Sequence, residues 1–232
     1  MTLFFKGTVR KAAHKVFHNV INSRYRRRVI SRFADKLGLV YFGNVDQSSD
    51  DYEVVRGFTV SSSHQDNHYC VGSVDDHDIA VVDRNDAVWQ ADRSVSIYHW
   101  LIVAIDLHTK QDIPHIFISA HNHDLKPYSA FFASNHTMRE IDLGTFEPYD
   151  RDFTSRFSIY SQPSESIQVE RLFPASCARV LAAHFWPLSI EIKDGFLYIY
   201  SDDSKIASNI LDTMLESGLW LTNHLDVQSE LV

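Results

Sequence analysis

The sequence has 232 residues, 44% of them apolar and 22% charged, an ordinary globular composition that excludes a disordered or collagen-like chain. Two distant cysteines, Cys70 and Cys177, exclude a disulfide framework, and no apolar run reaches the ~18 residues of a membrane-spanning helix. The formal net charge of -8 is divided unevenly: residues 1–36 hold ten basic residues and one acidic residue, a net of +9, so the other 196 residues carry -17.

The basic N-terminal segment has the apolar periodicity of a helix. Its apolar positions recur at helical spacing, and Gly38 stands where a helix C-terminus favours glycine. The apolar positions are Val9, Ala13, Val16, Val20, Val29, Ile30, Phe33 and Leu37. We predict one long helix, or two broken near residues 22–23, over about residues 8–37. The chain then divides into a basic helical arm, 1–37, and an acidic α+β body, 38–232, that forms a single domain.

Short apolar segments predict strands through the first half of the body. The longest is Ser94–Leu107, whose two faces are both apolar, as in a strand covered on both sides. The other candidates are Leu39–Phe42, Tyr52–Val60, His77–Asp83 and Pro114–Ala120. A short helix is expected from Pro127 to Ser134.

The second half alternates more clearly between strands and helices. Phe153–Tyr160 reads as a strand, and Asp194-Gly195 predicts a two-residue turn that joins strands Leu188–Lys193 and Phe196–Ser201. Helices are expected over Ser164–Arg171 and Pro174–Phe185. A last helix carries the stripe Ile206, Ile210 and Met214 and is expected to end at Gly218. These patterns predict an α+β fold with a largely antiparallel sheet and flanking helices, the hairpin lying beside Phe153–Tyr160.

The stretch over about residues 101–201 resembles a known bacterial family. The matching positions are Phe153, Phe157, Ile159, Tyr160, Pro163, Phe173, Pro174, Leu181, Glu191, Leu197, Tyr198 and Tyr200. The family consists of uncharacterised proteins that share a domain of unknown function. The resemblance implies a shared fold and carries over neither an activity nor catalytic residues. Some members carry membrane segments. This sequence has no apolar run long enough for one, so any membrane role is expected to be peripheral.

Thirteen histidines make a metal site the first chemical possibility. His121, His123 and Asp124 follow a predicted buried strand and resemble in part the HxH motif of metallo-hydrolases. Leu125 and Lys126 occupy the positions where that motif needs Asp and His. A zinc site would also need one distant ligand, for which His68, His108, His136 and Cys177 are options. The alternative is a polar loop in which Asp124 caps the helix at Pro127, and we expect no metal or other cofactor.

Other reactive side chains have ordinary structural explanations. His99 lies on an apolar strand face, where a core histidine is the simpler interpretation than a base. Cys70 beside His68 is a thiol–imidazole pair only if an orienting acid is present. Two acidic clusters, 75–78 and 202–203, lack the spacing of a calcium loop and read as turns and helix caps. The GxSxG, Walker and GxGxxG motifs are absent from the sequence.

The charge asymmetry therefore supplies the leading functional hypothesis. We expect a non-enzymatic interaction or scaffold module whose basic helix contacts an anionic surface or an acidic protein partner. The residues that would make this contact are Arg24, Arg26, Arg27, Arg28 and Arg32. Nucleic acid is the less favoured partner, because the aromatic residues fall mainly in the acidic body. The expected location is the cytoplasm, with peripheral attachment to a membrane as an open alternative. The alternative function is a metal-dependent hydrolase built on His121, His123 and Asp124.

Overall fold

The computed structural model describes residues 24–45, 63–89, 95–109, 111–121, 137–201 and 208–229. Within these residues nine strands form one sheet in the order β1-β2-β3-β4-β9-β8-β5-β7-β6, and all neighbouring strands are antiparallel. The strands are β1 Val40–Val45, β2 Ser63–Val74, β3 His77–Trp89, β4 Val95–Asp106, β5 Ile116–Ala120, β6 Arg139–Glu140, β7 Phe157–Ser161, β8 Ser189–Lys193 and β9 Phe196–Ser201. The α+β class and the antiparallel sheet predicted from the sequence are confirmed.

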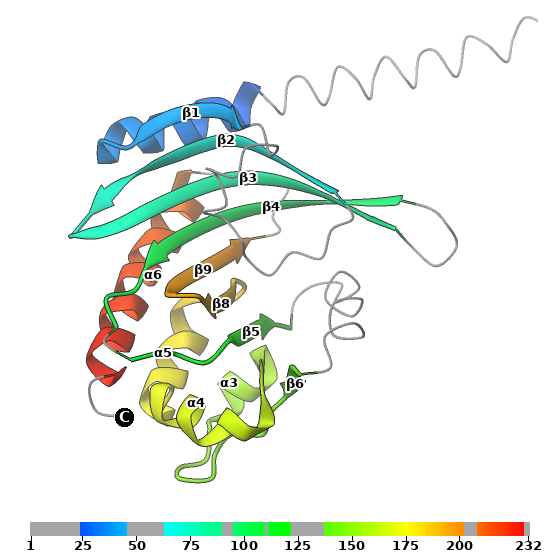
Figure 1. Cartoon of the computed structure of the whole chain (residues 1–232), viewed down its shortest axis with the longest axis vertical. Helices are drawn as coiled ribbons and strands as arrows, with labels where there is room; N and C mark the ends of the chain where they lie inside the picture. Colours follow the sequence, from blue (N-terminus) through cyan, green and yellow to red (C-terminus); the bar gives the residue numbers. More distant parts are fainter. Residues whose placement is uncertain are drawn as a thin grey trace, which may run out of the picture.

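The described helices pack on one face of this sheet (Figure 1). They are α3 Arg151–Arg156, α4 Ser166–Leu172, α5 Ala175–His184, α6 Ser208–Ser229 and an unlabelled helix over residues 24–37, here named the arm helix. The arm helix ends where predicted: Gly38 has φ 72°, and the N–H of Leu39 donates to the Ala34 carbonyl at 2.9 Å. All five helices contribute buried side chains to one apolar cluster with the strands.

The opposite face of the sheet carries a second buried cluster rich in aromatic side chains. Its members are Tyr69, Ala80, Val82, Trp100, Ile102, Ala104, Phe117, Met138, Tyr198 and Tyr200. None of the described helices contributes a buried residue to this cluster. Strand β4 thus has apolar side chains on both faces, as its sequence predicts.

The predicted hairpin forms, but its neighbour differs from the prediction. Strands β8 and β9 turn at Asp194-Gly195, with φ values of 52° and 78°, and Ile192 pairs with Leu197. The hairpin is inserted between β4 and β5, so β5 separates it from β7. The predicted strand over 153–160 is also divided, because residues 151–156 form α3 and only Phe157–Ser161 is extended. A hairpin with almost every residue buried belongs in the centre of the sheet rather than near its edge.

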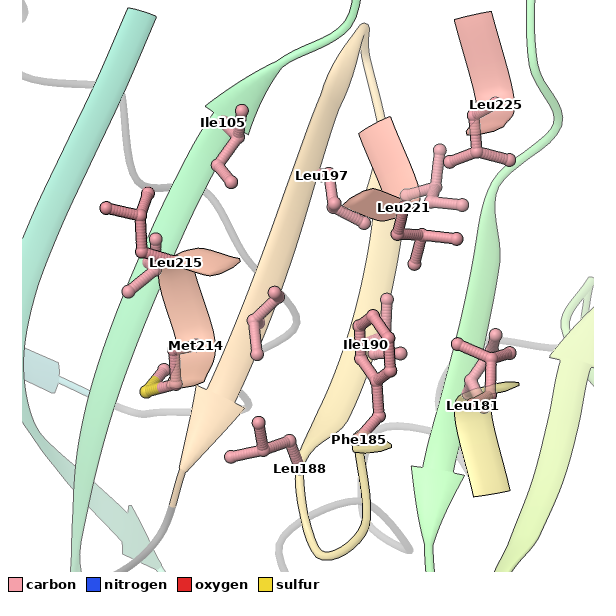
Figure 2. Packing of buried hydrophobic residues seen from close by; sticks show 14 of the residues in the cluster. Ile105, Leu181, Phe185, Leu188, Ile190, Leu197, Met214, Leu215, Leu221 and Leu225 are labelled. Atoms are coloured by element: carbon pink, nitrogen blue, oxygen red, sulfur yellow. The ribbon is translucent and has the colours of Figure 1, made fainter. Parts of the chain in front are cut away.

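Helix α6 continues through Gly218, which corrects the predicted end of the last helix. Its buried positions recur every three or four residues, and Figure 2 shows Met214, Leu215, Leu221 and Leu225 over strand residues such as Ile105 and Leu197. A Cβ atom at Gly218 would lie 2.5 Å from Ile105 Cδ1 and 2.9 Å from Ile199 Cδ1. Here glycine permits close contact between helix and sheet, so it does not mark a helix end.

Some predicted elements fall outside the described residues. These are residues 8–23 of the arm, the strand Tyr52–Val60 and the short helix from Pro127 to Ser134. The remaining predicted helices are present: α4 follows the 3-10 turn Pro163–Glu165, and α5 follows Pro174.

Candidate functional site

The arm helix presents one charged residue to the interior and the other basic residues to solvent. Arg26 is buried, and its guanidinium forms a bidentate pair with the buried carboxylate of Asp83, with Nε 2.6 Å from Oδ2 and Nη2 in contact with Oδ1. Arg24, Arg27, Arg28 and Arg32 are exposed. Arg26 therefore attaches the helix to β3. It is removed from the set of arginines predicted to contact an external partner.

An open groove of about 470 Å³ lies where the arm helix meets α6. We name it the basic groove and define it by its lining residues Tyr25, Arg28, Val29, Arg32, Phe33, Lys36 and Asp212. Arg28, Arg32 and Lys36 are four residues apart and so form one row about 12 Å long. Asp212 of α6 faces this row, with its Oδ1 2.7 Å from Lys36 Nζ.

His121, the one described residue of the predicted metal triad, lies in a serine–carboxylate chain. Its Nε2 is 2.8 Å from Ser158 Oγ, and Ser158 Oγ is 2.6 Å from Glu140 Oε1. Its Nδ1 is 3.1 Å from the Ser155 carbonyl oxygen, which assigns a proton to that nitrogen. These side chains line a pocket of about 250 Å³ at the β6–β7 edge. His123 and Asp124 lie outside the described residues, so the hydrolase triad stays a prediction.

A second titratable group lies inside the aromatic face of the sheet. Glu191 on β8 is 1% exposed, accepts a hydrogen bond from the Tyr200 hydroxyl at 2.6 Å, and has its Oε1 2.7 Å from His115 Nε2. Burial raises the pKa of Glu191, against the opposing effects of the His115 and Tyr200 hydrogen bonds. The sequence resemblance includes Glu191 and Tyr200 as fold positions, and the structure shows that they are hydrogen-bonded to each other.

Two histidines and two aspartates meet at the end of the sheet where β3 begins and β4 ends. His77, His108 and Asp226 each offer a ligand atom, and these three atoms lie within 4.8 Å of one another. The imidazole rings of His77 and His108 stack with their centroids 4.4 Å apart. Asp106 contacts both rings, with Oδ1 3.4 Å from His77 Nδ1 and Oδ2 3.2 Å from His108 Nε2. We name these four residues together the histidine cluster.

The other reactive residues singled out from the sequence have structural roles. Cys70 and Cys177 are free, buried thiols, and burial raises the pKa of each to about 12, so neither is a thiolate near neutral pH. His68 Nδ1 lies 2.7 Å from the Tyr41 hydroxyl. His99 contacts Asn85 Oδ1 through Nδ1 at 2.5 Å, and burial lowers the pKa of His99. These contacts agree with the structural interpretation of Cys70 and His68. His99 has a structural contact as well, but its side chain is exposed, which corrects its expected place in the core.

Glu170 of α4 holds the loop that precedes α3. Its Oε1 accepts backbone N–H hydrogen bonds from Gly144 at 3.1 Å and from Phe146 at 2.7 Å. Burial alone would raise the pKa of this carboxyl, but the hydrogen bonds from Phe146, Thr145 and Gly144 outweigh it and lower the pKa. The ionised carboxylate therefore stabilises the loop.

Replacing Glu170 by Gln is expected to lower the free energy of unfolding by about 1 kcal/mol at neutral pH, because the amide accepts hydrogen bonds without a negative charge. The folded-state pKa lies below the ordinary value of 4.5, so the advantage of the wild type is present above that value and is lost as the pH falls through the folded-state pKa. Urea unfolding at neutral and acidic pH measures the difference. An equal difference at both pH values would contradict this role, and the exposed Glu147→Gln serves as control.

Comparison with known proteins supports the fold and goes no further. No protein-family model matches the chain, and no curated protein sequence matches it significantly. Among solved structures, the chain is similar to the mycobacterial trehalose monomycolate transport factor A, TtfA, with a TM-score of 0.54 over 87% of this chain and 93% of that chain. The two sequences are 8% identical, so the likeness shows a shared fold alone. The resemblance to the bacterial family over residues 101–201 stays a prediction.

The described helices were also compared with the length and apolar character of a membrane-spanning helix. None of them combines the length and the apolar character that a membrane crossing requires. This finding agrees with the expectation from the sequence for the part of the chain that the structure describes.

Proposed function

We propose that the chain is a non-enzymatic interaction module that binds an acidic segment of a partner protein in the basic groove. The observation that carries this proposal is the row of Arg28, Arg32 and Lys36 along an open groove of about 470 Å³. Tyr25 and Val29 add apolar surface to the same groove, and the buried Phe33 forms part of its wall. Cations four residues apart beside apolar side chains suit an amphipathic helix whose acidic residues have the same spacing.

The contact between Lys36 and Asp212 supports a carboxylate-bearing occupant. Asp212 belongs to a helix that lies beside the arm helix, and its carboxylate already pairs with one cation of the row at 2.7 Å. A partner helix with aspartate or glutamate side chains would make the same type of contact with Arg28 and Arg32. Guanidinium groups favour such carboxylates because they can donate two parallel hydrogen bonds.

The charge of the remaining chain favours a short acidic segment over an extended polyanion. Residues 37–232 carry a net charge of -17, which repels a membrane leaflet or nucleic acid that approaches over a wide area. The buried free thiols support a reducing, cytoplasmic location for the module.

The proposal predicts salt-sensitive binding of a fluorescein-labelled peptide of about 12 residues, three helical turns, with glutamate at every fourth position and leucine between. Fluorescence anisotropy measures the affinity at about 50 mM and 500 mM salt, where screening lengths differ several-fold. The double variant Arg28→Ala, Arg32→Ala is expected to bind at least ~10-fold more weakly, because each lost charge-assisted hydrogen bond contributes about 1.5–3 kcal/mol. Arg151→Ala, an exposed arginine on α3, is the matched control.

Two further probes distinguish the other partner classes. Phosphatidylserine vesicles and a DNA duplex are titrated under the same low-salt conditions. If vesicles or DNA bind in a manner that depends on Arg28 and Arg32, and the peptide does not bind, the partner is a membrane or nucleic acid and the proposal of an acidic protein segment is wrong. Peptide binding that is unaffected by the double variant, or the absence of binding to all three probes, would show that the arginines are a solvated helix face.

A further inference from the structure

We propose that His77, His108 and Asp226 of the histidine cluster form a binding site for a divalent transition-metal ion of the zinc type. Three features of the fold bring these residues together. His77 follows the tight turn Asp75-Asp76, whose φ values are 50° and 67°, and begins β3. His108 comes two residues after the end of β4, and Asp226 lies near the C-terminus of α6. The site thus joins two neighbouring strands to the helix that packs against them.

The donor set is the first argument for this ion. Two imidazole nitrogens and one carboxylate oxygen are ligands that zinc accepts at bond lengths of about 2.0–2.2 Å, with a fourth position left to water. The three ligand atoms already lie within 4.8 Å of one another. Full coordination needs them to approach further, and the exposed His108 side chain is able to rotate. A harder cation such as calcium would require six or more oxygen ligands instead.

Asp106 supplies the second argument, because it contacts one nitrogen of each imidazole ring and leaves the other nitrogen for the ion. His77 Nδ1 is 3.1 Å from the Asp106 carbonyl oxygen, so this nitrogen is a donor and Nε2 keeps its lone pair. His108 Nε2 is 3.2 Å from Asp106 Oδ2, which leaves Nδ1 as the ligand. Metal-bound histidines are commonly oriented in this way by a carboxylate or a carbonyl.

Backbone contacts fix the two aspartates in place. The N–H of Asp78 donates to Asp106 Oδ1 at 2.7 Å, and the N–H of His108 donates to Asp226 Oδ1 at 3.0 Å. Within the described residues this hydrogen bond engages Oδ1 of Asp226, and Oδ2 is the oxygen that we assign to the ion. Two stacked histidines and two carboxylates therefore lie close enough together to coordinate a divalent cation or orient its ligands. Their arrangement differs from the predicted triad, since His123 and Asp124 have no part in it and the sequence offers His108 only as an optional distant ligand.

The test uses the full chain, freed of metal by a chelator and titrated with zinc chloride in a calorimeter. One zinc ion is expected to bind per chain. His108→Ala and Asp226→Asn are each expected to abolish this stoichiometric binding, and Asp106→Asn to weaken it ~10–100-fold, the usual effect of removing an orienting partner. His184→Ala, an exposed histidine at the end of α5, is the matched control and should bind as the wild type does.

A second measurement covers variants that fail to fold. Cobalt(II) added to the wild-type chain is expected to give the visible absorption of a low-coordinate ion with nitrogen ligands, and excess zinc should remove that absorption. Circular dichroism establishes which variants are folded. The proposal is wrong if the wild type binds no stoichiometric zinc, or if a folded His108→Ala variant binds it with unchanged affinity. Because the basic groove contains none of these ligands, failure here leaves the proposed function intact.

Discussion

Replacement of Arg26 by alanine is expected to lower the free energy of unfolding by about 3–5 kcal/mol, the usual cost of removing one partner of a buried ion pair. Arg26 and Asp83 are 6% and 4% exposed, so the Asp83 carboxylate would remain inside the fold without its guanidinium partner. The arm helix would also lose its polar attachment to β3. Urea unfolding followed by circular dichroism measures the change.

Two variants separate this effect from a general effect of charge. Arg24→Ala removes an exposed arginine of the same helix and should change the free energy by less than about 0.5 kcal/mol. The double variant Arg26→Met, Asp83→Leu replaces both charges by apolar groups and should recover most of the stability lost in Arg26→Ala. A loss of less than about 1 kcal/mol in Arg26→Ala would contradict the assigned role of the pair.

Replacement of Glu191 by alanine is expected to lower the free energy of unfolding by about 3 kcal/mol, because it removes the acceptor of the Tyr200 hydroxyl and leaves space inside the aromatic cluster. Urea unfolding again measures the loss, and the exposed Glu147→Ala is the control. Glu191→Gln keeps an acceptor for Tyr200 and should cost much less. If Glu191→Ala were as stable as the control, the contacts of Glu191 with His115 and Tyr200 would contribute little to the fold.

The pH dependence of Glu191 should be opposite in sign to that of Glu170. Burial raises the folded-state pKa of Glu191 above its ordinary value of 4.5. The stability of the wild type relative to Glu191→Gln should therefore be greatest below pH 4.5 and be lost as the pH rises through the folded-state pKa. For Glu170, whose folded-state pKa is lowered, the relative stability is lost in the acidic direction. The variants Glu170→Gln and Glu191→Gln should therefore show opposite changes of relative stability with pH, and each serves as a comparison for the other.

Local chemistry explains which parts of the fold could be predicted from the sequence. The β8–β9 hairpin follows from Asp194-Gly195 and from alternation within a few residues, and Gly38 marks the end of the arm helix. The placement of the hairpin between β4 and β5 depends on pairing with strands far away in the chain, which alternation alone does not encode. Gly218 misleads the sequence-based prediction because a glycine that permits close packing has the same sequence signal as one that ends a helix.

The candidate sites depend on such long-range contacts even more strongly. Arg26 and Asp83 are 57 residues apart, so no local motif links them. Arg26 lies four residues before Ile30, on the buried side of the arm helix. Asp83 lies on the same strand face as the buried Ile79 and Val81. A positive residue on the apolar face of a helix and a negative residue on the apolar face of a strand together indicate a buried ion pair. His77, His108 and Asp226 have no recognisable spacing, because three separate parts of the fold supply them.

Hydrogen–deuterium exchange with and without the glutamate peptide tests the central claim most directly, since it locates the bound segment on the full chain. Slower exchange is expected over residues 24–37 and at the start of α6, where Asp212 faces Lys36. The β8–β9 hairpin should be unchanged, and the double variant Arg28→Ala, Arg32→Ala should lose the protection. Protection that is confined to other elements, or that persists in the double variant, would contradict a binding site in the basic groove.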